Sequence, residues 1–251
     1  MKARMEPEGK TEKILLVTGA SSETGCALIR KCAGMYSRIW AHYGCSIEEL
    51  NALQQEWGDR ILPIQADFSR EDSVEEMLAQ IAAADAYPDH VVHLAAPKTC
   101  NKQFHKCHWE DYQKGVDISL RSAVLLLERL IPRMQKKRYG KIVFMLTSYV
   151  LGGVPPKYQS PYITVKYALY GLMRNLAAEY AAKGITVNAV SPDMMETKFL
   201  SEIPDLVIRQ NAERNPLGRN IAVEDVIPAI LYLLSDSAEA VTGQNIGVTG
   251  G

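Results

Sequence analysis

The chain has 251 residues, 47% of them hydrophobic and 23% charged, and a formal net charge of -1. A balance so close to neutral excludes a strong field for binding nucleic acid or an acidic membrane, and no apolar run approaches the roughly 20 residues of a membrane span. Residues 1–13 are polar and charged, which predicts a flexible N-terminal tail before one domain at residues 14–251. The five cysteines lack the spacing of a disulfide framework, so we expect free thiols and a cytoplasmic protein.

Short apolar runs alternate with longer segments of helical periodicity along the whole chain. Strands are predicted at residues 14–18, 38–43, 61–65, 91–94, 141–146, 186–190 and 247–248. Helices are predicted at residues 25–33, 47–57, 73–83, 109–134, 162–183 and 223–234, with a mobile helical flap at residues 201–215. This alternation indicates parallel βαβ units. The predicted fold is α/β, a single Rossmann-type, doubly wound parallel sheet of about seven strands with helices on both faces.

The first predicted strand runs directly into a glycine-rich turn and then a helix. The turn consists of Thr18, Gly19, Ala20, Ser21, Ser22, Glu23, Thr24 and Gly25. Gly19 allows the tight turn, and free N–H groups at the start of the helix attract an anion, with hydroxyl donors added by Ser21, Ser22 and Thr24. Glycine also occurs in ordinary strand–helix turns; the position of this turn after the first strand is what favours a dinucleotide pyrophosphate.

Two later strand ends are candidates for contacts with adenosine. NAD-binding proteins usually carry an acid after the second strand for the ribose, whereas this chain has Tyr43-Gly44-Cys45-Ser46. No carboxylate is present there to repel a 2′-phosphate and no arginine to bind one, and we favour NADP(H) over NAD(H). After the third strand, Asp67 and Phe68 are placed to hold the adenine edge, or Asp67 only caps a turn.

The helix predicted at residues 162–183 opens with Tyr162 and, four residues later, Lys166. Residues four apart share a helical face, so the phenol and the ammonium are expected side by side. A neighbouring cation favours the phenolate and lowers the phenol pKa from its reference value of about 10. Thr147 and Ser148 follow the fifth strand, at the sheet edge where ligands bind in this fold, which favours a reacting centre over a surface ion pair.

Taken in order, these motifs make the chain similar to the short-chain dehydrogenase/reductase family, and in particular to β-ketoacyl carrier-protein reductases. The resemblance covers nearly all of the chain after the tail. It rests on the glycine-rich turn, Asp67, His93-Leu94-Ala95-Ala96, Thr147/Ser148, Tyr162, Lys166, Asn188-Ala189-Val190-Ser191-Pro192, Thr197, Thr242-Gly243-Gln244 and Gly250-Gly251.

The resemblance implies a role for each matching residue. Tyr162 would give a proton to the carbonyl oxygen, Lys166 would bind the nicotinamide ribose and tune Tyr162, and Thr147 or Ser148 would polarise the carbonyl. Counting from Gly140 favours Thr147, and counting back from Tyr162 favours Ser148. The remaining implied cofactor contacts are Gly19, Gly25, Ala95, Ala96, Pro192, Met195 and Thr197.

The chain departs from the family pattern at four places. Glu23 replaces a glycine, and its carboxylate either turns to solvent or weakens cofactor binding by charge repulsion. His93-Leu94-Ala95-Ala96 replaces Asn-Asn-Ala-Gly. Ser119 stands where the family has an asparagine that holds a relay water, and Asp193 replaces the glycine after Pro192.

Three other features have competing interpretations. Cys100, His105, Cys107 and His108 lie close together, but their spacing matches no zinc module, and we expect a substrate loop without a metal. Lys136-Lys137-Arg138 stabilises a helix C-terminus or docks the acidic surface of an acyl carrier protein. The apolar stretch at residues 124–127 favours a subunit contact, and the resemblance implies a homodimer or homotetramer.

The sequence therefore predicts an NADPH-dependent ketoreductase that acts on a 3-oxoacyl thioester or a similar small ketone. The departures leave one alternative, a non-catalytic cofactor-binding or assembly protein on the same fold. A lyase or epimerase that uses the same tyrosine–lysine pair is a third possibility, although no residue singles it out.

Overall fold

The computed structural model describes residues 13–98, 101–201 and 203–251. The strands are β1 Ile14–Thr18, β2 Arg38–Tyr43, β3 Ile61–Gln65, β4 His90–His93, β5 Gly140–Met145, β6 Ile185–Pro192 and β7 Asn245–Val248. The α-helices are α1 Glu23–Cys32, α2 Glu48–Trp57, α3 Glu71–Ala83, α4 Trp109–Gly115, α5 Ser122–Lys137, α6 Ser160–Tyr180, α7 Asp205–Arg214 and α8 Val223–Leu234. Among the described helices, none combines the length and apolarity needed to cross a bilayer.

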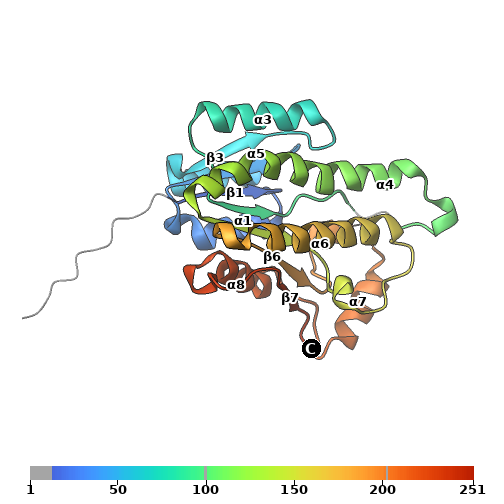
Figure 1. Cartoon of the computed structure of the whole chain (residues 1–251). Coiled ribbons are helices and arrows are strands. Elements are labelled where there is room, and N and C mark those ends of the chain that lie inside the picture. Colours follow the sequence, from blue (N-terminus) through green and yellow to red (C-terminus); the bar gives the residue numbers. More distant parts are fainter. Residues whose placement is uncertain (1–12, 99–100, 202) are drawn as a thin grey trace, which may run out of the picture.

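The seven strands of the described chain form one parallel sheet in the order β3-β2-β1-β4-β5-β6-β7. Figure 1 shows the helices layered over the two faces of this sheet. The predicted doubly wound α/β fold is confirmed. Chain order reverses between β1 and β4, so the carboxyl ends of β1, β4, β5 and β6 border a crevice at one edge, which is where ligands bind in such sheets.

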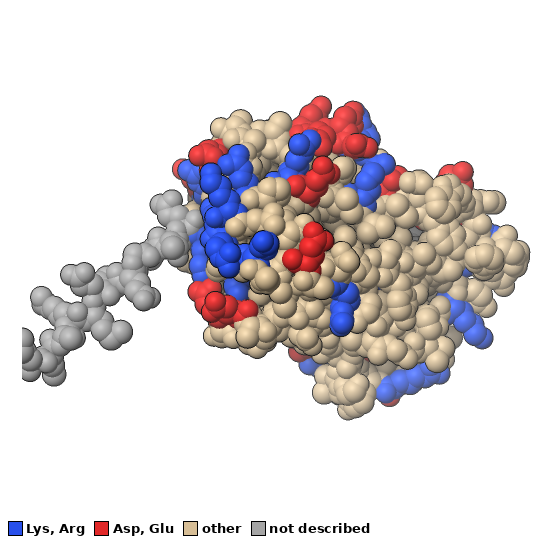
Figure 2. All heavy atoms as spheres, viewed as in Figure 1, with Lys and Arg blue, Asp and Glu red and all other residues tan. Residues whose placement is uncertain are grey.

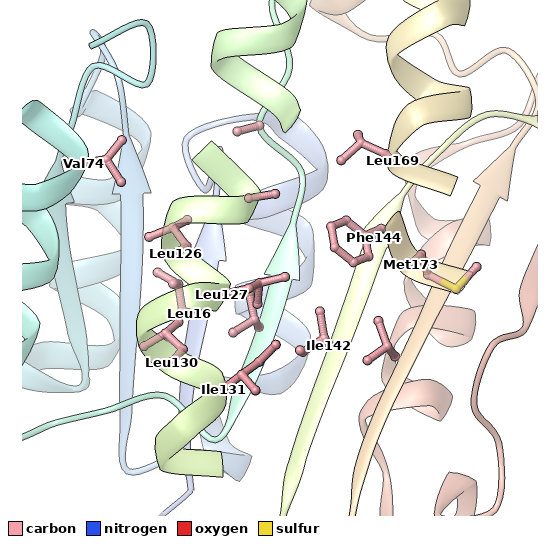
Figure 3. Packing of buried hydrophobic residues seen from close by; sticks show 14 of the residues in the cluster. Leu16, Val74, Leu126, Leu127, Leu130, Ile131, Ile142, Phe144, Leu169 and Met173 are labelled. Carbon is pink, nitrogen blue, oxygen red and sulfur yellow. The ribbon is translucent and has the colours of Figure 1, made fainter. Parts of the chain in front are cut away.

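Two apolar clusters sandwich the sheet because successive side chains of a strand point to opposite faces. Leu15 and Val17 of β1 join the cluster beneath α1, α2 and α8, whereas Leu16 joins the cluster beneath α3, α5 and α6. Ile142 and Phe144 of β5 also point to the second cluster, where Figure 3 shows them facing α5 and α6. Burial on both faces explains why these strands are continuous apolar runs in the sequence.

The helix predicted at residues 109–134 is interrupted. Its middle, Val116–Arg121, is a π-helix between α4 and α5. Within it the carbonyl of Ser119 accepts a hydrogen bond from Nε2 of His93, at 2.8 Å. This bond from outside the helix competes with the regular helical ladder. Such π-turns occur frequently at functional sites.

A chain of polar side chains, buried at Tyr36 and His90, crosses the opposite, amino edge of the sheet. Tyr36 Oη lies 2.7 Å from Nδ1 of His90, and Nε2 of His90 lies 2.8 Å from Oη of Tyr139. Tyr139 donates to Asp236, which also binds Lys13 at 2.9 Å. Lys13 was expected in the flexible tail, but this ion pair joins it to the turn that follows α8; the rest of that predicted tail lies outside the described residues.

Candidate active site

A cleft of about 1470 Å³ opens at the carboxyl edge of the sheet. The glycine-rich turn, the end of β5, the start of α6 and the segment after β6 all line it. The predicted site residues that it brings together are Ser21, Ser22, Thr24, Ala96, Thr147, Tyr162, Lys166, Pro192, Met195 and Thr197. Other predicted site residues lie around this cleft without lining it: Gly19, Gly25, Tyr43, Asp67, Phe68, Ala95, Ser119 and Ser148.

Two glycines give the turn its shape. Gly19 has φ +67°, and a Cβ there would lie 3.2 Å from the backbone nitrogen of Ala95. A Cβ on Gly25 would lie 2.5 Å from the carbonyl oxygen of Ala20. Both positions therefore require glycine, the first for its backbone conformation and the second because the turn packs directly against α1.

The start of α1 offers unpaired donors to a ligand. Ser22 caps the helix: its hydroxyl donates to the carbonyl of Gly19 and accepts from the N–H of Gly25. Within the described part of the chain, the N–H groups of Ser21, Glu23 and Thr24 have no acceptor. Three free N–H groups at the positive end of a helix fit the diphosphate of a dinucleotide.

Glu23 bridges the cleft. Its side chain is exposed, and Oε2 accepts a hydrogen bond of 2.9 Å from the backbone N–H of Lys198, in the segment after β6. The carboxylate has thus turned from the helix end toward this segment, but Glu23 and Lys198 both still line the cleft. Repulsion of a bound diphosphate by Glu23 remains a prediction.

The residues expected near adenosine have structural partners of their own. Oδ1 of Asp67 accepts from the backbone and the hydroxyl of Ser69, at 2.9 and 2.7 Å, so Asp67 caps a turn. Phe68 is buried and stacks on His42, with ring centroids 3.8 Å apart. No sequence pattern indicated a role for His42. Its Nδ1 accepts a hydrogen bond from the N–H of Gly19, and its Nε2 is hydrogen-bonded to the carbonyl of Ala66. It ties β2 and β3 to the glycine-rich turn, while Tyr43 is half-buried at the end of β2.

Tyr162 and Lys166 lie on one face of α6. The ammonium of Lys166 is 5.5 Å from the centroid of the Tyr162 ring and donates to the carbonyl of Met145, at 2.7 Å. The hydroxyl of Thr147 lies within hydrogen-bonding reach of the Tyr162 phenol. On the other side, the ring of Phe199 packs 5.9 Å from that of Tyr162. The phenol therefore lies between a threonine hydroxyl, a lysine and an apolar wall.

The pKa of Tyr162 moves in the direction opposite to the expectation from sequence. Burial raises it to about 12, although the hydrogen bond with Thr147 lowers it in part. Burial also lowers the pKa of Lys166, to about 8. Desolvation dominates both shifts because both groups are removed from water, which disfavours their charged forms. At neutral pH the phenol keeps its proton.

The hydroxyl of Ser148 is directed at Asp193 and not at Tyr162. Its hydroxyl donates to Oδ1 of Asp193 at 3.3 Å, and Oδ2 of Asp193 accepts from Asn211 and Asn215 at 3.3 and 3.5 Å. Of the two candidate hydroxyls, Thr147 is the one at Tyr162. The two asparagines hold α7 and the residue after it to the end of β6, so the predicted flap is anchored at its C-terminal end.

Ser119 takes part in the hydrogen bonding near the site through its backbone carbonyl and not through its hydroxyl. It is buried, and its carbonyl is occupied by His93. Nδ1 of His93 lies 3.0 Å from the hydroxyl of Thr18, which also accepts from the N–H groups of Leu94 and Ala95. Thr18 must therefore donate to Nδ1, which leaves the proton of His93 on Nε2, toward Ser119. The sequence showed the departure at His93 but gave no sign of this link.

The remaining candidates lie outside the cleft. Among the described residues no cluster of three metal-binding side chains occurs, and Cys100 falls outside them. In the basic run, Lys137 pairs with Asp89 at 2.6 Å and Arg138 donates to the carbonyl of Ala182. These two cations stabilise the C-terminal end of α5 through partners within the chain.

Comparisons with known proteins agree with this geometry. Residues 25–251 match a family model described as enoyl-(acyl carrier protein) reductase. The chain is 30% identical over 244 residues to the 3-oxoacyl-[acyl-carrier-protein] reductase of Staphylococcus epidermidis, covering 95% of this chain and 98% of that protein. It is also 30% identical over 245 residues to cis-4-hydroxycyclohexanecarboxylate dehydrogenase of Sinomonas cyclohexanicum, covering 97% and 98%. The crystal structure of levodione reductase matches with a TM-score of 0.86 at 25% identity, over 96% of this chain and 97% of that one.

Proposed function

The chain belongs to the short-chain dehydrogenase/reductase family of NAD(P)-dependent oxidoreductases, and from this premise we propose that it reduces ketones to secondary alcohols. One observation carries the proposal: the Tyr162 phenol, the Thr147 hydroxyl and the Lys166 ammonium meet in the cleft that begins at the glycine-rich turn. None of the described contacts favours the non-catalytic alternative.

Each of these side chains has a distinct part in the proposed reaction. Tyr162, whose raised pKa keeps it protonated, donates its proton to the carbonyl oxygen as negative charge develops there. Thr147 donates a hydrogen bond to the same oxygen. Lys166 stabilises the phenolate that remains, and its bond to Met145 fixes its position beside the ring. The bound dinucleotide supplies the hydride.

For the cofactor we propose NADPH. The free N–H groups of Ser21, Glu23 and Thr24 would hold the diphosphate, and no carboxylate directly follows β2 at Tyr43 to repel a 2′-phosphate. Titration of NADPH and NADH against the emission of the three tryptophans tests this order of affinity. Tighter binding of NADH would overturn it.

For the substrate we propose a 3-oxoacyl thioester carried by an acyl carrier protein, or a similar small ketone. Apolar side chains able to hold an acyl chain line the outer cleft: Val154, Phe199, Leu200, Ile203 and Val207. Exposed cations also line it and would attract an anionic carrier group: Lys98, Lys157 and Arg214. The Staphylococcus relative, a 3-oxoacyl-[acyl-carrier-protein] reductase, supports the same substrate.

We also propose that subunits pair through α5 and α6. Val124 and Tyr167 expose 43% of their surface on these helices, and Figure 2 shows a broad, mostly uncharged surface in the view where α5 and α6 face the reader. Light scattering on the purified protein distinguishes a dimer or tetramer from a monomer.

The test of the proposed reaction is Tyr162→Phe, compared with Tyr170→Phe on the same helix. We expect Tyr162→Phe to lose at least about 100-fold in kcat, the lower end of what a positioned proton donor contributes, while NADPH still binds. Tyr170→Phe should keep full activity. Equal activity in the two variants on a panel of ketones and thioesters would overturn the assignment.

A further inference from the structure

Asp193 places a carboxylate in the cleft at a position where the short-chain dehydrogenase/reductase family has a glycine. It follows Pro192 at the end of β6, is half-buried, and lines the cleft together with Thr147 and Tyr162. Ser148, which follows Thr147 in the chain, donates directly to it. Asp193 therefore places a negative charge in this cleft beside Ser148, the residue that follows Thr147 in the chain.

The partners of this carboxylate leave its charge unbalanced. They are the Ser148 hydroxyl at 3.3 Å and the side-chain amides of Asn211 and Asn215 at 3.3 and 3.5 Å, all neutral donors. Within the described chain no lysine, arginine or histidine forms an ion pair with it. A half-buried charge without a counter-ion acts over a longer range than one at the surface, because solvent screens it less.

The other charges of the cleft are arranged differently. Of the cations that line it, Lys166 is buried beside Tyr162, and the others are exposed and would draw anions toward the cleft: Arg30, Lys98, Lys157, Lys198, Arg214 and Arg219. Glu196 lines the cleft too, but its carboxylate is exposed and accepts from Asn220 at 2.6 Å, away from Ser148. The cleft thus combines exposed cations, which would draw anions in, with the ammonium of Lys166 beside Tyr162 and the carboxylate of Asp193 beside Ser148.

We infer that Asp193 is a specificity-determining residue, which selects ketones that are uncharged near the reacting carbonyl and rejects free keto acids. This inference rests on the proposed function. A 3-oxoacyl thioester or ester is neutral around its ketone and is accepted, whereas the corresponding 3-oxo acid brings its carboxylate against Asp193. Two unit charges about 6 to 10 Å apart, at an effective dielectric constant of about 20, discriminate by roughly 15- to 100-fold.

The test compares ethyl 3-oxobutanoate with 3-oxobutanoate in the wild type and in Asp193→Asn. Asparagine keeps the size of the side chain and an oxygen that accepts from Asn211, so α7 stays anchored. We expect the wild type to prefer the ester in kcat/KM by at least about 15-fold. In Asp193→Asn the preference should narrow about 10-fold or more, through a lower KM for the acid and with little change for the ester.

Two variants separate charge at this position from other causes. Glu196→Gln removes a carboxylate from the same cleft, and Ser148→Ala removes one donor to Asp193 without changing the charge; both should keep the wild-type preference. An equal preference in wild type and Asp193→Asn, or an equal narrowing in Glu196→Gln, would overturn the inference while leaving the reductase activity in place. Turnover of neither compound by the wild type would instead overturn the proposed function, and the inference with it.

Discussion

Lowering the pH from 7 to 5 should strongly destabilise this protein, because three histidines are buried in neutral form. His42, His90 and His93 are 3%, 1% and 3% exposed. Burial lowers the pKa of His42 to about 4 and those of His90 and His93 to about 3, and repulsion from Lys13 and Lys141 adds to the effect at His90. Each ring is also held by hydrogen bonds that use its neutral form, as in the chain from Tyr36 to Tyr139.

The direction and the magnitude of this loss of stability follow from proton linkage. Below pH 6.5 the unfolded chain binds protons at these histidines and the folded chain does not, so stability is full above that pH and falls until the folded pKa values are reached, near 4 and 3. Between pH 7 and 5 each histidine removes about 2 kcal/mol, and the three together about 6 kcal/mol. That is comparable with the whole stability of a typical domain, about 5 to 15 kcal/mol.

Urea unfolding at constant ionic strength, followed by tryptophan emission and circular dichroism at several pH values in this range, measures the effect. The matched control is His93→Asn, since an amide can still donate to Ser119 and accept from Thr18 but does not titrate. Its loss of stability over the same range should be smaller by about 2 kcal/mol. A wild-type loss below about 2 kcal/mol, or an unchanged loss in the variant, would refute the reasoning, because these rings would then titrate alike in the folded and unfolded chain.

Three further outcomes follow from the site. Thr147→Val should lower kcat by about 100-fold, as the loss of a donor to a developing oxyanion does, and Ser148→Ala should cost only a few-fold; equal losses in steady-state assays would contradict the choice of hydroxyl. Glu23→Gly should bind NADPH about 10-fold more tightly in a fluorescence titration, because a like charge leaves the diphosphate site, and weaker binding would contradict the repulsion. Gly25→Ala places a Cβ 2.5 Å from the carbonyl oxygen of Ala20, so urea unfolding should show a loss of at least about 1 to 3 kcal/mol, and unchanged stability would be inconsistent with that packing.

The layout of the fold could be predicted because its signals are local. Strands buried on both faces give continuous apolar runs such as the one at β1, and helices give a repeat of about 3.6 residues. The π-helix at Val116–Arg121 could not be predicted in this way. Its middle carbonyl bonds to His93, and no property of residues 116–121 alone indicates that partner.

The same distinction between local signals and distant partners applies to the candidate site. Helical spacing alone places Tyr162 and Lys166 side by side. The choice between Thr147 and Ser148 needed the structure, because counting along the sequence from the two ends gave different answers. The direction of the Tyr162 pKa was wrong because a sequence shows which charge is near but not how deeply both groups are buried.

The departures from the family pattern have acquired partners, which bears on whether the site has been rebuilt or has decayed. Glu23 accepts from the backbone of Lys198, His93 joins Thr18 to Ser119, and Asp193 gathers three donors. Each contact joins segments far apart in the chain around one cleft. In a site that had lost its function, nothing would maintain partners for the replaced polar side chains. These side chains would then remain unpaired, which is costly when they are buried, or be lost. Paired replacements that leave Tyr162, Lys166 and Thr147 together therefore favour an active enzyme over the non-catalytic alternative.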